Sequence, residues 1–301
     1  MKTSQLLARA KSHEKRGEIS EAIQFYLSVL EASPQNSKAI KRLKALRATI
    51  LQNSQSSPTQ DEIDSVIALH SKGQTRESLQ TSELLIGKYP NEAFFYNLSG
   101  VCYADLGQLE TAVRYYHQAL NINPDYAEVH SNLGNVLQDI GQLDEAVSSF
   151  QRALEIQPDY LEAHYNLGIL LQNIGQLDAA VNSYEQALKI NPDYTKAHFN
   201  LGMALKTLGQ LDAAVNSYEK VLKITPNHAE AHYNLGNVFR DLGQLNEAVT
   251  RYQRALEINS DYADAYHNLG NTLKELGQLD EAVSSYKQAL EVNPDYADAH
   301  N

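Results

Sequence analysis

The sequence has few of the features that mark secreted, membrane or disulfide-bonded proteins. Among its 301 residues there is one cysteine, Cys102, which excludes an internal disulfide framework and a zinc site built from cysteines. No run approaches the roughly 18 apolar residues that a membrane-spanning helix needs. The basic N-terminus lacks the apolar core of a secretory signal peptide. Together these absences predict a cytoplasmic protein.

Positive charge is scarce beyond the N-terminal segment. Residues 1–51 carry ten Lys/Arg and four Asp/Glu, a net of +6, whereas the other 250 residues carry 15 and 33, a net of −18. Nucleic acids bind to positive faces, so the acidic body argues against them as partners. The basic helix expected around Lys41, Arg42, Lys44 and Arg47 has two interpretations, a solvated face or a contact with an acidic membrane or another chain.

What the sequence does have is a 34-residue repeat. Seven of its 15 glycines fall in one register of 34, six more fall in a second, and six of its eight prolines fall in a third; Gly17 and Pro34 have the same mutual spacing in an N-terminal unit. Numbering each repeat from position 1 to position 34, six full repeats start at Ala93, Ala127, Leu161, Thr195, Ala229 and Ala263.

Each repeat is expected to form two helices. Positions 4, 7, 8 and 11 have helical spacing, glycine at position 15 predicts a turn, positions 20, 24 and 27 form a second helical face, and proline at position 32 ends the second helix. The small Gly134 and Ala146 are expected where the two helices cross, with aromatic residues such as Phe150 filling the space between them. Asp159 and Glu162 predict a capping box for the next helix, as do Asp125 with Glu128 and Asp261 with Asp264.

These residues resemble the tetratricopeptide repeat consensus: Leu-Gly at positions 7–8, Gly at 15, Ala at 20, Tyr or Phe at 24, Ala at 27 and Pro at 32. The resemblance implies an all-α fold, an α-α superhelix of helix-turn-helix repeats. The expected organisation is a basic helical module over 1–51, a linker over 52–60, a degenerate repeat over 61–92, six repeats over 93–296, and the start of a further repeat over 297–301.

Helical geometry predicts a binding face on the first helix of each repeat. Positions 2, 6, 9 and 13 point away from the stripe at 4, 7, 8 and 11. Asparagine occupies position 6 in five of the six repeats and position 9 in three: Asn132, Asn166, Asn200, Asn234 and Asn268, with Asn135, Asn237 and Asn271. An amide matches the donors and acceptors of an extended peptide backbone. This ladder is the predicted peptide-binding site, with neutral or basic protein segments as partners; the alternative is a polar filler copied by duplication.

Several phrases, among them HSNLGNVLQDIGQLDEAV and AHYNLGNVF, resemble the N-terminal superhelix of O-linked N-acetylglucosamine transferases and their bacterial relatives. That resemblance implies an asparagine ladder lining a concave groove. The sequence therefore predicts a non-catalytic scaffold for protein–protein interaction. The alternative is the substrate-recruiting region of a larger glycosyltransferase or other enzyme whose catalytic domain is absent from these residues.

No catalytic, metal or cofactor site is predicted. Histidines recur at position 4 (His130, His164, His198, His232 and His300). Equivalent side chains run parallel about 10 Å apart and do not converge on a metal, so a half-buried row on the core stripe is expected. Cys102 lies at a packing position and is expected to be a buried, inert thiol.

Two regions depart from the pattern. In the repeat from Ala93, the groove positions carry Phe94, Leu98 and Val101, which predicts either an apolar anchor pocket or packing against the degenerate repeat. At the other end the sequence stops at Asn301, early in a further repeat. The preceding helix is therefore expected to leave its neighbour-facing side open, to be covered by more chain or by self-association.

Overall fold

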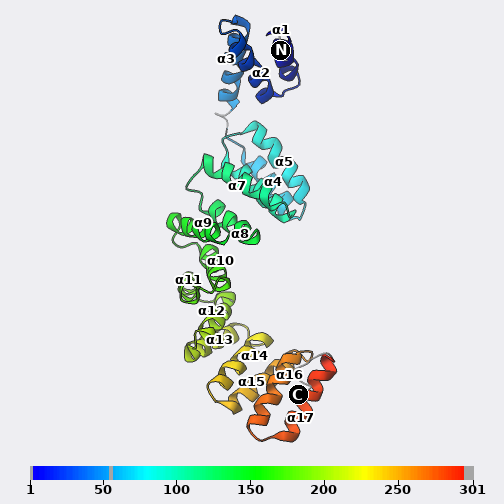
Figure 1. Ribbon diagram of the computed structural model, residues 1–301, viewed down its shortest axis with the longest axis vertical. Coiled ribbons are helices and arrows are strands. Elements are labelled where there is room, and N and C mark those ends of the chain that lie inside the picture. The colour runs from blue at the N-terminus through cyan, green and yellow to red at the C-terminus, as the bar shows by residue number, and fades with distance from the viewer. Residues whose placement is uncertain (1–2, 54–56, 295–301) are drawn as a thin grey trace. The chain divides into compact units, whose positions relative to one another are not determined.

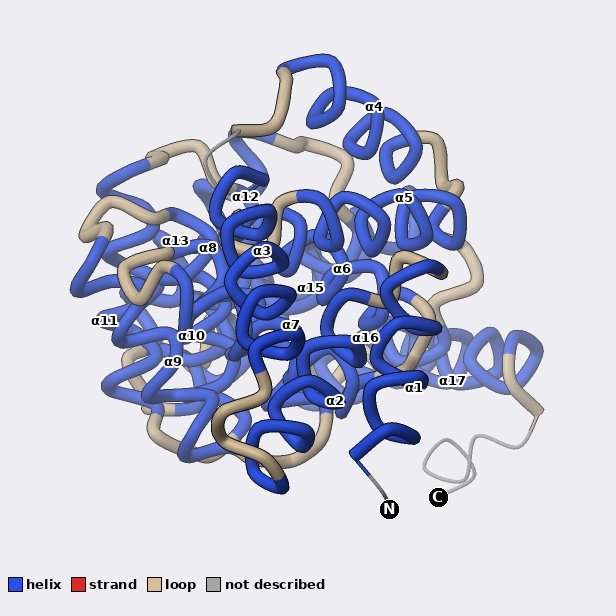
Figure 2. Tube along the Cα trace, turned by 90° about the horizontal axis from the view of Figure 1, so that it is seen from above, coloured by secondary structure: helices blue, strands red, loops and turns tan. Residues whose placement is uncertain are grey.

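The computed structural model describes residues 3–53 and 57–294, and every regular element there is a helix (Figures 1 and 2). The predicted all-α class, a superhelix of helix-turn-helix repeats, is confirmed. The chain forms two compact units, residues 1–124 and 125–301. This division falls inside the predicted array, and the predicted domain boundaries stay a prediction.

The first unit contains seven helices within its described residues. They are α1 (Thr3–Lys15), α2 (Ile19–Ala32), α3 (Ser37–Asn53), α4 (Gln60–Ser71), α5 (Thr75–Lys88), α6 (Ala93–Asp105) and α7 (Leu109–Ile122). The second unit has ten. They are α8 (Ala127–Asp139), α9 (Leu143–Ile156), α10 (Leu161–Asn173), α11 (Leu177–Ile190), α12 (Thr195–Thr207), α13 (Leu211–Ile224), α14 (Ala229–Asp241), α15 (Leu245–Ile258), α16 (Ala263–Glu275) and α17 (Leu279–Val292).

In the second unit each repeat is a helical pair, and the pairs stack in order. The second helix of one repeat packs on the first helix of the next, as α11 does on α12, and neighbouring first helices also contact each other. One pair has too little apolar surface to be stable alone, so stability comes from stacking. This arrangement brings the first helices into one row, which carries the candidate site.

Close approach within each pair depends on the glycine at position 8. A Cβ on Gly134 would lie 3.0 Å from the Phe150 ring, and a Cβ on Gly168 would lie 2.5 Å from the Tyr184 ring. Phe150 and Tyr184 are fully buried, as is Ala146. The predicted crossing of the two helices at small residues is therefore confirmed, with the aromatic ring at position 24 filling the space over the glycine.

The turn between the two helices requires glycine for a different reason. At position 15 the chain adopts a left-handed conformation, with φ of +80° at Gly141 and +78° at Gly175. Residues with a Cβ rarely adopt this conformation. The predicted turn at position 15 is confirmed.

The helix N-caps differ from the sequence prediction. The predicted capping boxes are wrong for all three pairs: Asp125 with Glu128, Asp159 with Glu162, and Asp261 with Asp264. The N-caps are the tyrosines at position 34, such as Tyr160, and they make no side-chain cap hydrogen bond. The turn places aspartate one residue too early; in one repeat the backbone N–H of Asp193 donates to Asn191 Oδ1 at 3.1 Å.

A capping box does occur where the sequence predicted a linker. The backbone N–H of Glu62 donates to Thr59 Oγ1 at 3.3 Å, and the N–H of Thr59 donates to Glu62 Oε2 at 2.9 Å. Lys88, 2.7 Å away, and the Thr59 N–H hold the pKa of Glu62 at about 2. Thr59 is therefore the N-cap of α4, and the helix begins at Gln60.

The core stripe of the first helices is shifted from the predicted one. Positions 3 and 10 are buried, as with Ala163 and Leu170, whereas the described histidines at position 4 are half-buried except His232, which is 6% exposed. In three repeats the histidine Nε2 lies within hydrogen-bonding distance of the carbonyl oxygen of the proline six residues earlier: His164 to Pro158 (2.9 Å), His198 to Pro192 (2.9 Å) and His232 to Pro226 (3.0 Å). The histidines thus satisfy the carbonyl groups of the turn between repeats.

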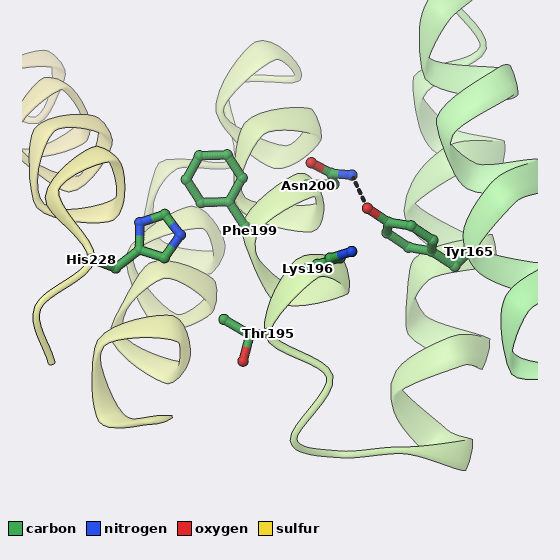
Figure 3. A pocket seen from close by; sticks show the side chains of 6 residues that line it. All are labelled: Tyr165, Thr195, Lys196, Phe199, Asn200 and His228. Carbon is green, nitrogen blue, oxygen red and sulfur yellow. Dashed lines mark hydrogen bonds between the residues drawn. The ribbon is translucent and has the colours of Figure 1, made fainter. Parts of the chain in front are cut away.

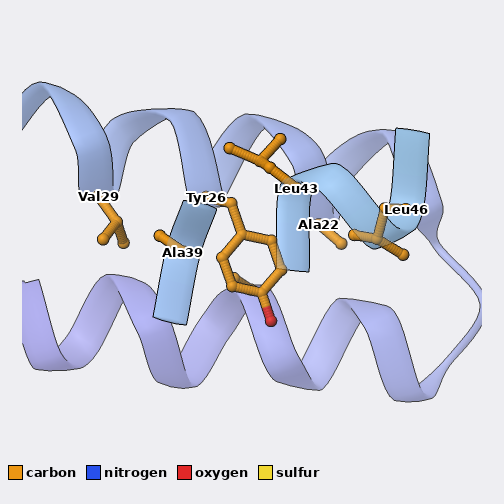
Figure 4. Close-up of a cluster of buried hydrophobic side chains, with 7 residues drawn as sticks. Ala22, Tyr26, Val29, Ala39, Leu43 and Leu46 are labelled. Carbon is orange, nitrogen blue, oxygen red and sulfur yellow. The ribbon is translucent and has the colours of Figure 1, made fainter. Parts of the chain in front are cut away.

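In the first unit, α1, α2 and α3 enclose their own core (Figure 4). Tyr26 lies in that core beside Val29 and Leu43. Its hydroxyl donates to Glu14 Oε2 at 2.8 Å. Burial and this carboxylate raise the pKa of Tyr26 to about 12. The basic side chains of α3 named above are exposed.

In the repeat that starts at Ala93, two apolar residues at the groove positions pack against the degenerate repeat before it. Leu98 and Cys102 are buried in a cluster with Val66 and Leu79, and Phe94 packs against the same cluster. Val66 and Leu79 belong to the degenerate repeat, so the packing interpretation is confirmed for Phe94 and Leu98. Burial raises the pKa of the Cys102 thiol, as expected for a structural cysteine.

Candidate functional site

The asparagines at position 6 form a row along the first helices of the second unit. Asn132 on α8, Asn166 on α10, Asn200 on α12, Asn234 on α14 and Asn268 on α16 are all half-buried. Positions 2 and 13 of the same helices are exposed. The predicted face is therefore not uniformly open: its outer rows face solvent, while its asparagines lie between neighbouring first helices.

Two of these amides bond to the asparagine at position 9 of the preceding repeat. Asn166 Nδ2 donates to Asn135 Oδ1 at 3.1 Å, and Asn268 Nδ2 donates to Asn237 Oδ1 at 2.9 Å. Asn135 is half-buried and Asn237 is only 8% exposed. The position-9 asparagines thus orient the position-6 amides, a role that a single helical wheel does not reveal.

The tyrosine at position 5 of the preceding repeat supplies a second acceptor. Asn200 Nδ2 donates to the Tyr165 hydroxyl at 3.2 Å, and Asn268 Nδ2 also lies 3.0 Å from the Tyr233 hydroxyl. Asn200 depends on this contact because position 9 of its preceding repeat is Ile169, which has no polar atom. The amides of Asn166, Asn200 and Asn268 therefore link their repeats to the preceding ones.

Asn234 has neither acceptor. Its preceding repeat carries Phe199 at position 5, without a hydroxyl, and Met203 at position 9, whose thioether is a weak acceptor. Within the described part of the chain, the Asn234 side chain makes no hydrogen bond. This amide keeps its two donors and its acceptor for water or a ligand.

The remaining predicted residue, Asn271, is also engaged internally. Its Oδ1 accepts a hydrogen bond from the Tyr286 hydroxyl at 2.8 Å, and its Nδ2 lies 2.9 Å from His267 Nε2. The sequence alone does not indicate these contacts, because they depend on how the tyrosine at position 24 folds back over its own first helix.

A pocket of about 160 Å³ opens beside Asn200, in the middle of the row (Figure 3). It is lined by Tyr165, Thr195, Lys196, Phe199, Asn200 and His228. The rings of Phe199 and His228 stack with centroids 5.3 Å apart and planes inclined by 22°. Of the residues that line this pocket, sequence analysis named only Asn200 as a site residue. The recurring aromatic residues at positions 5 and 34 were the sequence feature that could have indicated its walls.

The outer rows of the face are mostly acidic. Position 2 is exposed in every repeat of the second unit and carries Glu128, Glu162, Lys196, Glu230 and Asp264. Position 13 adds Asp139, Asp241 and Glu275, also exposed. Burial and nearby carboxylates, Glu230 and Asp264 among them, raise the pKa of Tyr262 beside this face. The exposed charges of the outer rows are thus mostly negative, with Lys196 as the exception at position 2.

Among residues 3–53 and 57–294, no group of three or more His, Cys, Asp or Glu side chains lies close enough to hold a metal ion. The same residues contain no helix both long and apolar enough to cross a membrane. His300 lies outside the described residues.

The helical pairs, their stacking and the row of inter-repeat contacts define a helical-repeat protein. Models described as TPR repeat match residues 100–141, 204–239 and 236–277, and models described as tetratricopeptide repeat match 125–193, 183–216 and 263–296. The chain belongs to the tetratricopeptide repeat family. Members of this family bind proteins, and the fold is typically non-catalytic. No curated protein matches the chain in sequence.

Solved structures similar to this one are also tetratricopeptide repeat proteins. YrrB, described as a TPR protein with an unusual peptide-binding site, has a TM-score of 0.56 and 24% identity over 62% of this chain and 95% of its own. The C-terminal part of a TPR repeat-containing protein from Cytophaga hutchinsonii has a TM-score of 0.68 and 19% identity, and the match covers 79% of this chain and 97% of that one. PilF of Pseudomonas aeruginosa has a TM-score of 0.57 and 19% identity, and the match covers 69% of this chain and 95% of that one. At these identities the likeness concerns the fold.

Proposed function

We propose that this protein is a non-catalytic scaffold that binds extended segments of partner proteins along its row of position-6 asparagines. The observation that carries the proposal is Asn234, a half-buried amide of the row that makes no hydrogen bond to any residue the structure describes. A half-buried amide that is unpaired gains most from a ligand whose backbone supplies a donor and an acceptor. YrrB, whose fold is similar, is described as having a peptide-binding site.

The spacing of the row matches an extended peptide. Packed helices lie about 8–10 Å apart, and an extended chain rises about 3.3 Å per residue. One asparagine can then serve about every third residue of the peptide. Amides that bond to main-chain groups discriminate little between side chains, so a ladder of this kind accepts many sequences. In the proposal the position-6 asparagines contact the peptide, and Asn135, Asn237 and Asn271 at position 9 hold the surrounding network in place.

Charge narrows the range of partners. The exposed acidic side chains at positions 2 and 13 attract basic segments and repel acidic ones over about a Debye length, roughly 8 Å at physiological salt. We therefore expect neutral or basic protein segments as ligands, and neither nucleic acid nor a membrane. A cytoplasmic location is part of the same proposal.

A second candidate function is the recruitment of substrates for an enzyme on the same polypeptide. It is favoured by the recurrence of asparagine at position 6 in five successive repeats, the ladder that the resemblance to O-linked N-acetylglucosamine transferases implies. A transfer assay on the natural full-length polypeptide separates this function from that of a free-standing scaffold.

A third expectation concerns the last described helix. On α17, Leu279 is 62% exposed and Val283 is 50% exposed. Self-association through this face remains a proposal. Sedimentation of the wild type and of Val283→Asp tests it: a wild-type dimer that the substitution dissociates supports the proposal, and a monomeric wild type contradicts it.

The test of the main proposal compares asparagines on and off the row. Peptides selected from a random library on the wild-type protein are measured against Asn234→Ala, Asn200→Ala and the control Asn216→Ala, which changes an exposed residue on α13. Loss of a net hydrogen bond of about 0.5–1.5 kcal/mol weakens binding about twofold to tenfold. We expect Asn234→Ala to do so for unrelated peptides and Asn216→Ala to have no effect. Unchanged affinity in the triple variant Asn166→Ala, Asn200→Ala, Asn234→Ala contradicts the proposal.

A further inference from the structure

One residue reverses the charge of the exposed row at position 2. The row runs Glu128, Glu162, Lys196, Glu230 and Asp264, and all five side chains are exposed. Lys196 makes no ion pair with any of the residues that the structure describes, so its charge is not neutralised within the protein. A single unpaired cation thus stands between two carboxylates, one repeat away on either side.

The same residue lines the pocket of about 160 Å³ (Figure 3). Phe199 stacked on His228 forms one wall, and Tyr165 with Asn200 forms the other. The volume is that of one medium-sized side chain, since a cavity of about 150 Å³ accepts benzene. The pocket is therefore large enough for the side chain of one bound residue, and Lys196 is its only charged lining residue.

Two groups that line the pocket can donate to a ligand. His228 Nδ1 accepts a hydrogen bond from the backbone N–H of Ala231 at 3.3 Å, so in the neutral ring the proton lies on Nε2. The Lys196 ammonium adds a charged donor. A carboxylate can accept from both groups, whereas an ammonium or guanidinium group meets the like charge of Lys196.

We propose that this pocket takes the side chain of an aspartate or glutamate from an otherwise basic segment of a partner protein. The inference rests on the proposed function, because the segment is the one held by the asparagine row. Glu162 and Glu230 lie one repeat to either side of Lys196, and one repeat spans about three residues of an extended peptide. The preferred ligand is therefore an acidic residue with lysine or arginine about three positions before and after it.

Both attraction and repulsion contribute to this preference. The carboxylate pairs with Lys196 in a site partly walled by rings, while a carboxylate shifted by one repeat meets Glu162 or Glu230 instead. The charge pattern thus fixes the register of a peptide that main-chain contacts alone would allow to slide.

The experiment is a selection from a random dodecapeptide library displayed as an N-terminal fusion to a phage coat protein. Displayed peptides have no free C-terminal carboxylate, so an enriched acid acts through its side chain. The baits are the wild type, Lys196→Glu, and the control Lys220→Glu, which makes the same charge change on an exposed residue of α13. The wild type and the control should enrich an acidic residue flanked by basic ones, and Lys196→Glu should enrich basic residues at every charged position.

A binding measurement then tests the individual contact. Replacing the acidic residue of a selected peptide by glutamine should weaken binding to the wild type about threefold to fivefold, the range of a partly exposed ion pair. The same replacement should have no effect on Lys196→Met. Peptides enriched by the wild type without an acidic residue overturn this inference and leave the proposed function standing. If the wild type enriches no peptide, both are overturned.

Discussion

The hydroxyl of Tyr252 donates a 2.7 Å hydrogen bond to Oδ1 of Asn237, whereas the equivalent hydroxyl of Tyr218 has no partner among the residues that the structure describes. Both rings are fully buried. Tyr218 lacks an acceptor because position 9 of its repeat is Met203, and because position 12 is Lys206, whose Nζ lies 3.4 Å from Asp241. One repeat therefore carries an unsatisfied buried hydroxyl where the next repeat has a bonded one.

This difference predicts opposite effects of removing the two hydroxyls. Tyr252→Phe leaves Asn237 Oδ1 with one bond fewer and should lower the free energy of unfolding by about 1 kcal/mol. Tyr218→Phe removes a hydroxyl that is buried without a bond and should be neutral or stabilising. Urea unfolding followed by circular dichroism measures both. An equal loss of stability in the two variants would contradict the assignment.

Met203→Asn should supply the missing acceptor. In the next repeat Asn237 accepts from both Tyr252 and Asn268, so an asparagine at position 203 is placed to accept from both Tyr218 and Asn234. The expected gain in stability is about 0.5–1.5 kcal/mol.

The same variant links stability to the proposed binding. Because it occupies the free amide of Asn234, we expect selected peptides to bind more weakly. The control for the gain in stability is Ile169→Asn, since Tyr184 and Asn200 beside that position already donate to Gln172 at 2.9 Å and to the Tyr165 hydroxyl at 3.2 Å. A stabilised Met203→Asn with unchanged peptide affinity would argue against a direct role for Asn234.

Glycine-to-alanine substitutions separate close packing from backbone conformation. Gly168→Ala places a Cβ 2.5 Å from the Tyr184 ring and should destabilise by about 1–3 kcal/mol. Gly175→Ala meets no atom within 4 Å but occupies φ of +78°, so its cost arises from the backbone. Gly87 on α5 has neither constraint, and Gly87→Ala should stabilise by up to about 1 kcal/mol. Thermal unfolding of the three variants measures the order.

Low pH should destabilise the repeat that contains His232. Burial lowers the pKa of His232, with the nearby cations Arg251 and Arg254 acting in the same direction. The folded state therefore favours the neutral ring, and the unfolded state binds more protons once the pH falls below its ordinary value of about 6.5. Stability is expected to be constant above that pH and to decrease as the pH falls below it.

The measurement is the free energy of unfolding between pH 8 and pH 5 for the wild type and His232→Gln. The decrease should be smaller in the variant, and His117→Gln, at an exposed residue, should behave like the wild type. Identical pH profiles in all three proteins would contradict a buried neutral His232.

The sequence by itself determined the repeat and its local structure. Gly141 at a left-handed turn, Gly134 against Phe150, and Pro158 after α9 each act within one repeat, where helical spacing and residue size are sufficient evidence. The row of asparagines on the first helices was also evident from the sequence, because position 6 has a fixed direction on a helix.

Only the tertiary structure decided which of those amides are engaged. The partners of Asn166 and Asn268 lie on the preceding first helix, the wall of the pocket at Tyr165 comes from another repeat, and the N-caps are tyrosines set by the turn between repeats. These contacts depend on the angle at which one helical pair stacks on the next. That angle results from packing along the whole array, and no pattern within 34 residues specifies it.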